Sequence, residues 1–137
     1  MKLLFDTNVI LDVLLDRKPH SIASGALWNS VERKKCQGVL AAHCITTIHY
    51  LISKHSGAFS AGQTIRSLQA VFGVAAVDGH IIGDAMRLEW ADFENAVTAA
   101  AAIGAGCDAI VTRDPKGFSK SALPVLTPET ASILISN

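Results

Sequence analysis

The sequence predicts an α/β fold with three layers, helix, sheet and helix, around a mostly parallel central sheet of four to five strands. Short apolar runs alternate with longer helical patterns along the chain of 137 residues, which is typical of parallel strands joined by helical crossovers. Half of the residues are hydrophobic but only 6% are aromatic, a composition that suits helices packed closely on a sheet. Because no repeat, low-complexity tract or linker interrupts the pattern, residues 1–137 are expected to form a single domain.

In the first half of the chain, changes of hydrophobic periodicity separate the expected elements. Residues 2–5 form an apolar run that predicts a strand, and a helical pattern begins after Asp6. Residues 22–35 predict a helix whose basic end complements the helix dipole, and residues 38–41 predict a second strand. Two helices follow, on either side of a break at residues 57–62. Their apolar faces are Ile45, Ile48, Leu51 and Ile52 in the first, and Ile65, Leu68 and Phe72 in the second.

The second half of the chain repeats the alternation. The segment Gly104-Ala-Gly106 fits the end of a helix, because glycine readily adopts the left-handed conformation found there. A last helix is expected from Thr127-Pro128-Glu129, with a capping hydroxyl and a proline in its first turn. The other expected elements are a strand at residues 74–77, helices near residues 80–89 and 92–103, a fourth strand at residues 109–112 and an edge strand at residues 125–126.

The net charge and the cysteines indicate how the protein could bind a polyanion and in which compartment it is expected. Twelve basic and twelve acidic residues cancel, so the overall field does not attract a polyanion, which a metal or a small patch would have to hold. The cysteines Cys36, Cys44 and Cys107 are widely spaced and indicate reduced, buried thiols rather than disulfides. We expect a cytoplasmic protein without a membrane segment, because Asp6 interrupts the first apolar run and no run approaches the ~18 residues of a membrane span.

Polar residues follow two of the expected strands at their carboxyl ends, the usual ligand edge of an open α/β sheet. Asp6 and Asn8 follow the first strand, and residues 112–114 follow the fourth. The helix that begins near Asp92 would add further oxygen ligands, because Asp92 and Asn95 are three residues apart and share one face of its first turn. We therefore expect oxygen ligands to converge at this edge from distant parts of the chain.

Oxygen ligands alone favour a hard divalent cation, Mg²⁺ or Mn²⁺. Such an ion polarises a phosphoryl oxygen and lowers the pKa of a bound water for attack on a phosphodiester. It also supplies positive potential that a neutral chain lacks. The candidates for catalysis are Asp6, Asp92 and Asp114; those for metal binding are Asp6, Asp92, Asn95 and Asp114; those for polar support or substrate contact are Asn8, Thr112, Arg113 and Lys116.

Simple structural roles remain open for several of these side chains. Asp6 and Asp92 are also suited to cap the helices that follow them, and Asp114 before a proline suits a turn. Arg113 and Lys116 flank the expected site, which makes them candidates for phosphate contacts. The acids excluded from the site are Asp108, which would begin a strand at the opposite edge, and Asp12, Asp16 and Asp84, interpreted as solvated or local charges.

Three blocks of sequence together resemble a PIN domain across essentially the whole chain. They are Asp6-Thr-Asn-Val-Ile-Leu-Asp12, Asp92-Phe-Glu-Asn-Ala-Val97 before an alanine-rich helix, and Cys107-Asp-Ala-Ile-Val-Thr-Arg-Asp114-Pro-Lys-Gly-Phe118. The resemblance implies an α/β/α, metal-dependent endoribonuclease with Asp6 as a metal ligand, Asp114 as the late-strand acid, and Thr112 and Asn8 in support.

The resemblance also implies partners for the chain. Many small bacterial PIN domains are the toxin halves of toxin-antitoxin pairs, so a cognate antitoxin protein is expected beside the RNA substrate. Small members are commonly dimers, so a homodimer is expected too. An apolar helix face formed by Ile65, Leu68 and Phe72 is a candidate surface for it if exposed.

Two positions depart from the family pattern. Asn95 stands where the family often has an aspartate, and the helix after the second strand offers Thr46, Thr47 or His49 where the family often has a glutamate. Fewer negative charges predict weaker metal binding, so activity is expected to be slow, dependent on Mn²⁺ or absent. The same departures motivate a second hypothesis, a PIN-like domain without catalysis that binds RNA or a protein.

A third hypothesis takes Asp6 as the nucleophile of a phosphatase-like enzyme that forms an aspartyl phosphate. That chemistry expects a second acid two residues later, where this chain has Asn8. Metal binding without a phosphoenzyme would separate the ribonuclease from the phosphatase, and metal binding itself would separate the ribonuclease from the binding module.

Overall fold

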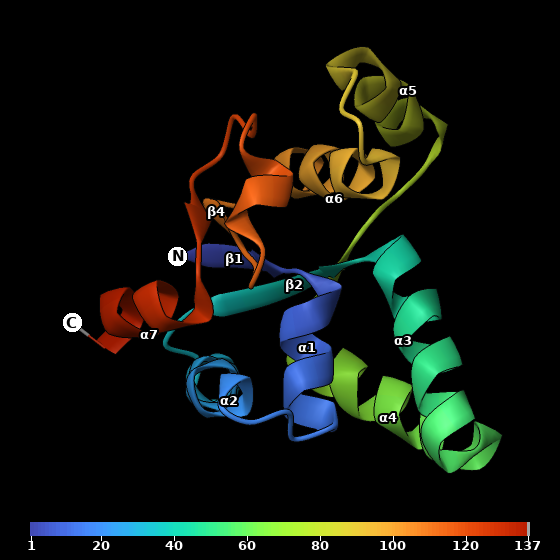
Figure 1. Cartoon of the computed structure of the whole chain (residues 1–137), viewed down its shortest axis with the longest axis vertical. Helices are drawn as coiled ribbons and strands as arrows, with labels where there is room; N and C mark the ends of the chain where they lie inside the picture. The colour runs from blue at the N-terminus through green and yellow to red at the C-terminus, as the bar shows by residue number, and fades with distance from the viewer. Residues whose placement is uncertain (137) are drawn as a thin grey trace.

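The protein folds around a parallel sheet of five strands in the order β3-β2-β1-β4-β5. The structure is a computed structural model and describes residues 1–136. Since all neighbouring strands run in the same direction, their carboxyl ends meet at one edge of the sheet (Figure 1). The strands are β1 (Lys2–Phe5), β2 (Gln37–Ala41), β3 (Gly73–Ala75), β4 (Ala109–Val111) and β5 (Val125–Leu126).

Helices connect the strands and cover both faces of the sheet. In the part of the chain that the structure describes, no helix has the length and apolar character needed to cross a membrane. The helices are α1 (Thr7–Leu14), α2 (His20–Glu32), α3 (Ala42–Ser56), α4 (Ala58–Val71), α5 (Gly79–Leu88), α6 (Phe93–Gly104) and α7 (Pro128–Ser136), with a 3₁₀ helix, η1, at Pro115–Phe118.

The hydrophobic core has two halves, one on each face of the sheet. Successive β1 side chains alternate between them, with Leu3 and Phe5 on one face and Leu4 on the other. Residues of α1, α2, α4 and α7 cover the first face, while α5 and the alanine-rich α6 cover the second (Figure 1). The predicted three-layer α/β/α fold with a parallel sheet is therefore confirmed.

Most element boundaries differ from the predicted ones by one or two residues, and two differences have a clear local cause. The helix expected at residues 22–35 ends at Glu32, and the basic residues after it form a turn in which Lys34 has a φ of 61°. The break expected over residues 57–62 is the single residue Gly57, whose φ is 89°. In both places one left-handed residue ends a helix more abruptly than hydrophobic periodicity can indicate.

The helix face suggested for dimerisation lies inside the monomer, so the prediction that it offers an exposed surface is wrong. Leu68 and Phe72 are only 1% and 4% exposed, and Ile65 packs against the same core. Phe72 lies between Phe5 and Trp28, with ring centroids 5.1 Å apart in each pair. The sheet itself covers this face, and therefore these residues stabilise the fold instead of recruiting a second chain.

The cysteines are free and buried, as their spacing predicts. Cys36 precedes β2, Cys44 lies in the first turn of α3, and Cys107 precedes β4. Burial raises the pKa of all three thiols, that of Cys44 to about 11. They therefore stay protonated at neutral pH and act as small core side chains.

A matched pair of glycines tests the packing of the first core half. An alanine Cβ at Gly38 in β2 would lie 2.6 Å from the ring of Phe72 and 3.0 Å from Val31, so Gly38→Ala should lower the free energy of unfolding by about 1–3 kcal/mol. In α2, the space around Gly25 is open, and Gly25→Ala should raise it by roughly 0.5–1 kcal/mol. Urea unfolding of both variants measures the difference, and equal effects would contradict the packing described here.

Candidate active site

Asp6 is held at the carboxyl end of the central strand by bonds to both neighbouring segments. Its backbone N–H donates to Val111 O in β4 at 2.9 Å. Its Oδ1 accepts from the Thr7 N–H at 2.9 Å, which caps α1, and its Oδ2 accepts from the Thr112 hydroxyl at 2.8 Å. The expected capping role is thus confirmed, and the cap leaves the carboxylate at the ligand edge of the sheet.

Thr112 joins the two acids that follow β1 and β4. Its side chain is fully buried, and its Oγ1 donates to Asp6 and accepts from the backbone N–H of Asp114 at 3.1 Å. The position of the Asp114 backbone is thereby tied to the Asp6 carboxylate, whereas the Asp114 side chain is exposed. A threonine suits this link because one hydroxyl both donates and accepts.

Negative charge accumulates around Asp6. Burial raises the pKa of Asp6 above its ordinary value, the bonds from Thr112 and Thr7 lower it, and the nearby carboxylates of Glu94 and Asp114 raise it again. Glu94 lies in the first turn of α6, where an acid also interacts favourably with the helix dipole. Its effect on Asp6 places it beside the site, so the acidic edge comprises Asp6, Glu94 and Asp114.

Asn95 lies next to Asp114, with its amide engaged by the loop after β4. The amide Nδ2 donates to Gly117 O at 3.2 Å. A Cβ built on Gly117 would lie 2.6 Å from this nitrogen and 3.0 Å from Asp114 Oδ2, so both side chains flank the glycine. The predicted convergence of Asn95 and Asp114 is therefore present.

Asp92 is set apart from this group. Its Oδ1 accepts from the Asn95 N–H at 3.0 Å, which caps α6. Asp92 also lines a cleft of about 210 Å³ beside η1, together with Trp90 and Lys116. Asp92 is absent from the charges that act on Asp6 and lines the same cleft as Lys116; its capping role is present, and its role as a metal ligand stays a prediction.

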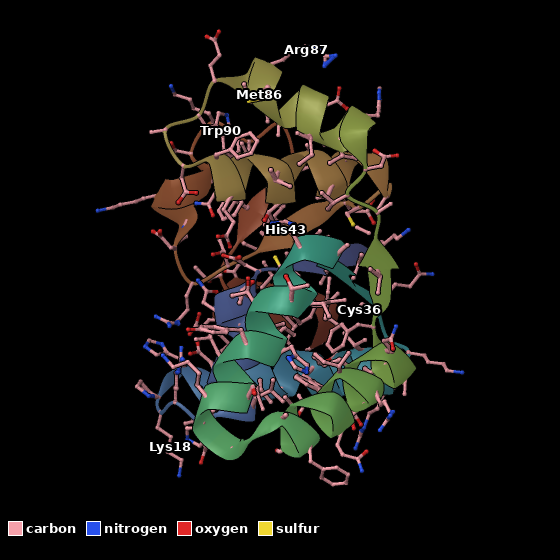
Figure 2. The ribbon with its side chains drawn as sticks, turned by 90° about the vertical axis from the view of Figure 1, so that its right-hand side faces the viewer. Lys18, Cys36, His43, Met86, Arg87 and Trp90 are labelled. Carbon is pink, nitrogen blue, oxygen red and sulfur yellow. The ribbon has the colours of Figure 1, made fainter. Side chains whose placement is uncertain are left out.

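His43 is a neighbour of the site that the sequence analysis does not single out. Its Nε2 lies 3.2 Å from Thr98 Oγ1, and its buried Nδ1 has no partner within the described residues. Desolvation lowers the pKa of His43, while the charges of Glu94 and Asp6 oppose this shift. Figure 2 shows His43 where the start of α3 meets the layer of α6.

A simple positional signal would have found this histidine. His43 follows the second strand at the same sheet edge as Asp6, and a polar residue at that position is a candidate for the site. Thr46 and His49, which the sequence offers in place of a glutamate, are exposed, and Thr46 donates to His43 O.

Arg113 and Asp12 form an ion pair that differs from expectation. Asp12 is 0% exposed, so its interpretation as a solvated charge is wrong. Arg113 donates to it through Nε and Nη2, and Arg17 lies 3.6 Å away. The backbone N–H of Arg113 donates to Asn8 Oδ1 at 3.3 Å. The Arg113 guanidinium thus bonds Asp12 of α1 and is partly exposed, whereas Lys116, the other predicted phosphate contact, is exposed.

The donor set at this edge fits a hard cation that keeps several of its waters. Among residues 1–136, no three His, Cys, Asp or Glu side chains converge closely enough to enclose a metal by themselves. Mg²⁺ commonly binds through one or two carboxylates and completes its shell with water and substrate oxygens. Asp6 and Asp114, joined through Thr112, supply such a pair, and a cation would offset the repulsion that raises the pKa of Asp6.

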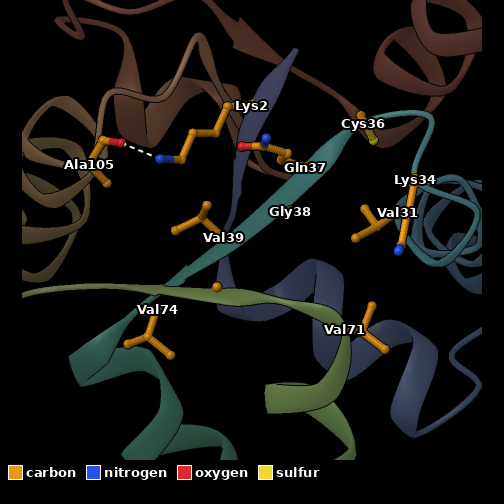
Figure 3. A pocket seen from close by; sticks show the side chains of 11 residues that line it. Lys2, Val31, Lys34, Cys36, Gln37, Gly38, Val39, Val71, Val74 and Ala105 are labelled. Atoms are coloured by element: carbon orange, nitrogen blue, oxygen red, sulfur yellow. Dashed lines mark hydrogen bonds between the residues drawn. The ribbon is translucent and has the colours of Figure 1, made fainter.

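The opposite edge of the sheet lacks this chemistry. A cavity of about 500 Å³ opens at the amino ends of β2 and β3, and Lys2, Lys34 and Gln37 are its polar lining. Figure 3 shows Lys2 Nζ bonded to Ala105 O, at 2.6 Å. Asp108 also lies at this edge, where it accepts from the Lys2 N–H, as predicted. No carboxylate lines the cavity among the described residues, so its volume does not make it a metal site.

Comparison with known proteins places the chain in a family. The model of the PIN domain matches residues 2–116. The chain belongs to the PIN domain family. No protein of curated function has a significantly similar sequence. The matched residues include all of the acidic edge, so Asp6, Glu94 and Asp114 are part of the PIN domain itself.

Solved structures of toxin-antitoxin proteins share the fold of this PIN domain. VapBC2 from Rickettsia felis, bound to a promoter DNA fragment, is 12% identical with a TM-score of 0.71, over 93% of this chain and 98% of that one. A toxin-antitoxin complex from Klebsiella pneumoniae is 21% identical, with a TM-score of 0.68 over 92% and 97% of the chains. VapC20 from Mycobacterium tuberculosis, a toxin that cleaves the sarcin-ricin loop, is 14% identical, with a TM-score of 0.69 over 86% and 94%.

Replacing Asp6 should stabilise the metal-free PIN domain. Because the pKa of Asp6 is raised above 3.8, folding favours the protonated form, and this contribution is lost as the pH rises through the raised value. Asp6→Asn removes the charge, so the variant should be more stable than the parent at pH 7 by roughly 1 kcal/mol. The difference should vanish below pH 3.8.

Thermal unfolding in EDTA between pH 3.5 and 7 (roughly the interval over which a carboxyl of this kind titrates) checks this expectation. Asp16→Asn is the control, since Asp16 is an exposed acid that bonds only Ser21. A parent that is more stable than Asp6→Asn at pH 7 would show that the Asp6 charge is compensated in the metal-free fold.

Proposed function

We propose that this PIN domain is a metal-dependent endoribonuclease. The observation that carries the proposal is the link from the Asp6 carboxylate through Thr112 to the backbone of Asp114, which brings two acidic residues to one edge of the sheet. Glu94 adds charge to the same place, although Asp6 is partly buried. A fold tolerates the clustering of partly desolvated acids where a ligand offsets their charge.

The residues at the acidic edge have distinct roles in this proposal. Asp6 and Asp114 would hold Mg²⁺ or Mn²⁺, with Asn95 Oδ1 as a neutral oxygen donor, and Thr112 would keep the two acids in register. The bound ion would supply a water of lowered pKa and neutralise charge on the phosphodiester. Lys116, exposed beside the cleft that Asp92 lines, would contact an RNA phosphate.

The partners expected from the resemblance remain part of the proposal. An antitoxin is supported by the titles of related structures, which name VapBC2 and a Klebsiella complex as toxin-antitoxin assemblies. RNA as substrate is supported by VapC20, named as a toxin that cleaves the sarcin-ricin loop. We propose in addition a cytoplasmic location and a homodimer, whose surface is not the buried face of α4.

A second function, RNA or protein binding without catalysis, is favoured by Asn95. Its amide Nδ2 is bonded to Gly117 O, so one of the expected ligands is neutral, and α3 contributes His43 in place of a carboxylate. This candidate and the ribonuclease differ in one measurable property, the binding of a divalent ion.

The ribonuclease proposal predicts that Asp6→Asn abolishes metal binding and cleavage while the fold remains intact. Mn²⁺ and Mg²⁺ titration by calorimetry, followed by incubation of labelled RNA with the better ion, measures both properties. The exposed Asp16→Asn variant should behave like the parent. If the parent binds no ion up to millimolar concentrations, the binding module replaces the ribonuclease as the better proposal.

Asn95→Asp should strengthen the metal site and weaken the empty fold. A carboxylate would lose the amide bond to Gly117 O and repel Asp114, which should lower the stability of the metal-free protein by about 1 kcal/mol. The added charge should raise Mn²⁺ affinity about tenfold. Calorimetry and thermal unfolding with and without Mn²⁺ measure the two effects, and unchanged affinity would exclude this position from the ligand set.

A further inference from the structure

Asp12 is an unusual acid because it is completely buried and lies outside the acidic edge. Among residues 1–136 the buried polar side chains are Thr7, Asp12, Ser24, Thr98 and Thr112, and Asp12 alone among them carries a charge. An ionised carboxylate without partners in a protein interior is strongly unfavourable. Its presence in the core therefore requires compensating contacts, and a function that a hydrophobic residue would not serve.

Arg113 supplies most of the compensation. Its Nε lies 2.5 Å from Asp12 Oδ2 and its Nη2 lies 3.3 Å from Asp12 Oδ1. Two parallel bonds between a planar guanidinium and a carboxylate fix orientation as well as distance. Arg17 approaches from the other side, with Nη1 3.6 Å from Asp12 Oδ1. The side chains of Arg113 and Arg17 remain partly exposed, at 33% and 40%, whereas the Asp12 side chain is 0% exposed. Asp12 is therefore enclosed by the protein, and the two arginines reach it from the surface.

The position of Arg113 in the chain makes this contact relevant to the site. Arg113 stands between Thr112, which bonds Asp6, and Asp114. Its backbone N–H also donates to Asn8 Oδ1 in α1. Two side chains of helix α1 therefore bond Arg113, the residue immediately before Asp114. Asp12 accepts from its guanidinium, and Asn8 accepts from its backbone N–H.

The contacts between α1 and Arg113 are needed because the acids at the edge of the sheet repel one another. Asp6 and Asp114 follow the adjacent parallel strands β1 and β4 and are joined through Thr112, so two acidic residues meet at one edge of the sheet. Asp114 is exposed and lies between the short strand β4 and the 3₁₀ helix η1, where the bond from its backbone N–H to Thr112 is one restraint on its position. The bond from Asp12 to Arg113 resists outward movement at the residue next to Asp114.

We propose that Asp12 is a positioning residue, which holds Arg113 so that Asp114 stays beside Asp6 for metal binding. The proposal rests on the proposed metal-dependent function, because metal binding is the purpose that it assigns to the alignment of Asp114 with Asp6. The alignment itself is a property of the metal-free protein, and the two parts can be measured separately.

Asp12→Asn is the variant that tests the proposal, because asparagine keeps the shape of the side chain and removes its charge. In metal-free protein, hydrogen exchange of the Arg113 and Asp114 backbone amides should accelerate about tenfold. Mn²⁺ affinity measured by calorimetry should fall about tenfold or more, as is typical when a residue that orients a metal ligand is changed. Arg113→Lys, which keeps the charge but loses the two parallel bonds, should show smaller shifts in the same direction, and it serves if Asp12→Asn does not fold.

A core substitution separates positioning from a general loss of stability. Ile52 in α3 is buried in the same core half as the apolar residues of α1 but outside the acidic edge. Ile52→Val should lower the thermal unfolding temperature while leaving Mn²⁺ affinity and the exchange of the Arg113 and Asp114 amides unchanged. If Ile52→Val weakens Mn²⁺ binding as much as Asp12→Asn does, Asp12 acts only through stability and the proposal is wrong.

The remaining outcomes distinguish this inference from the proposed function. Loss of Mn²⁺ binding in Asp6→Asn with unchanged binding and exchange in Asp12→Asn would overturn the positioning role and leave the metal site in place. Unchanged Mn²⁺ binding in Asp6→Asn would overturn the metal site. In that case faster exchange of the Asp114 amide in Asp12→Asn would still support the positioning of Asp114 by Asp12, and unchanged exchange would reject it.

Discussion

The bridge that Thr112 forms between Asp6 and Asp114 is the contact on which the candidate site depends. It exists because β1 and β4 are adjacent and parallel, so the residue after each strand reaches the same edge of the sheet. The hydroxyl donates to one acid and accepts from the backbone of the other. The buried threonine thus fixes the backbone position of Asp114 relative to the Asp6 carboxylate.

The site and the stability of the fold make opposite demands on charge. Burial and two neighbouring carboxylates act against the ionised form of Asp6, yet the proposed metal site requires the ionised form. The opposing restraints come from helix α1, through the Thr7 N–H to Asp6 and through Asp12 to Arg113. Charge repulsion at the carboxyl edge is thus balanced by these contacts to α1, which lies in the first core half with β1, together with the hydroxyl of Thr112.

Local sequence patterns anticipate much of this arrangement, and the misses share one cause. Alternating apolar runs indicate the strands, and a polar residue after a strand indicates the ligand edge, which is why Asp6, Thr112 and Asp114 are predictable. The burial of Asp12 and the contacts of His43 are not predictable in this way, because their surroundings are built by segments about a hundred and about fifty residues away in the chain. Asp92 and Asn95 share a helix turn, yet only Asn95 approaches Asp114, since the two face different neighbours.

The sequence by itself determined the order of strands and helices, the membership of the PIN domain family and the acids available at the ends of β1 and β4. These follow from periodicity and short motifs, which are properties of neighbouring residues. Only the tertiary structure decided which charges are buried and which side chains meet. Burial and pairing depend on how the layers pack. The apolar face of α4 packs against the sheet, and Asp12 is buried in the core because Arg113, far away in the sequence, bonds its carboxylate.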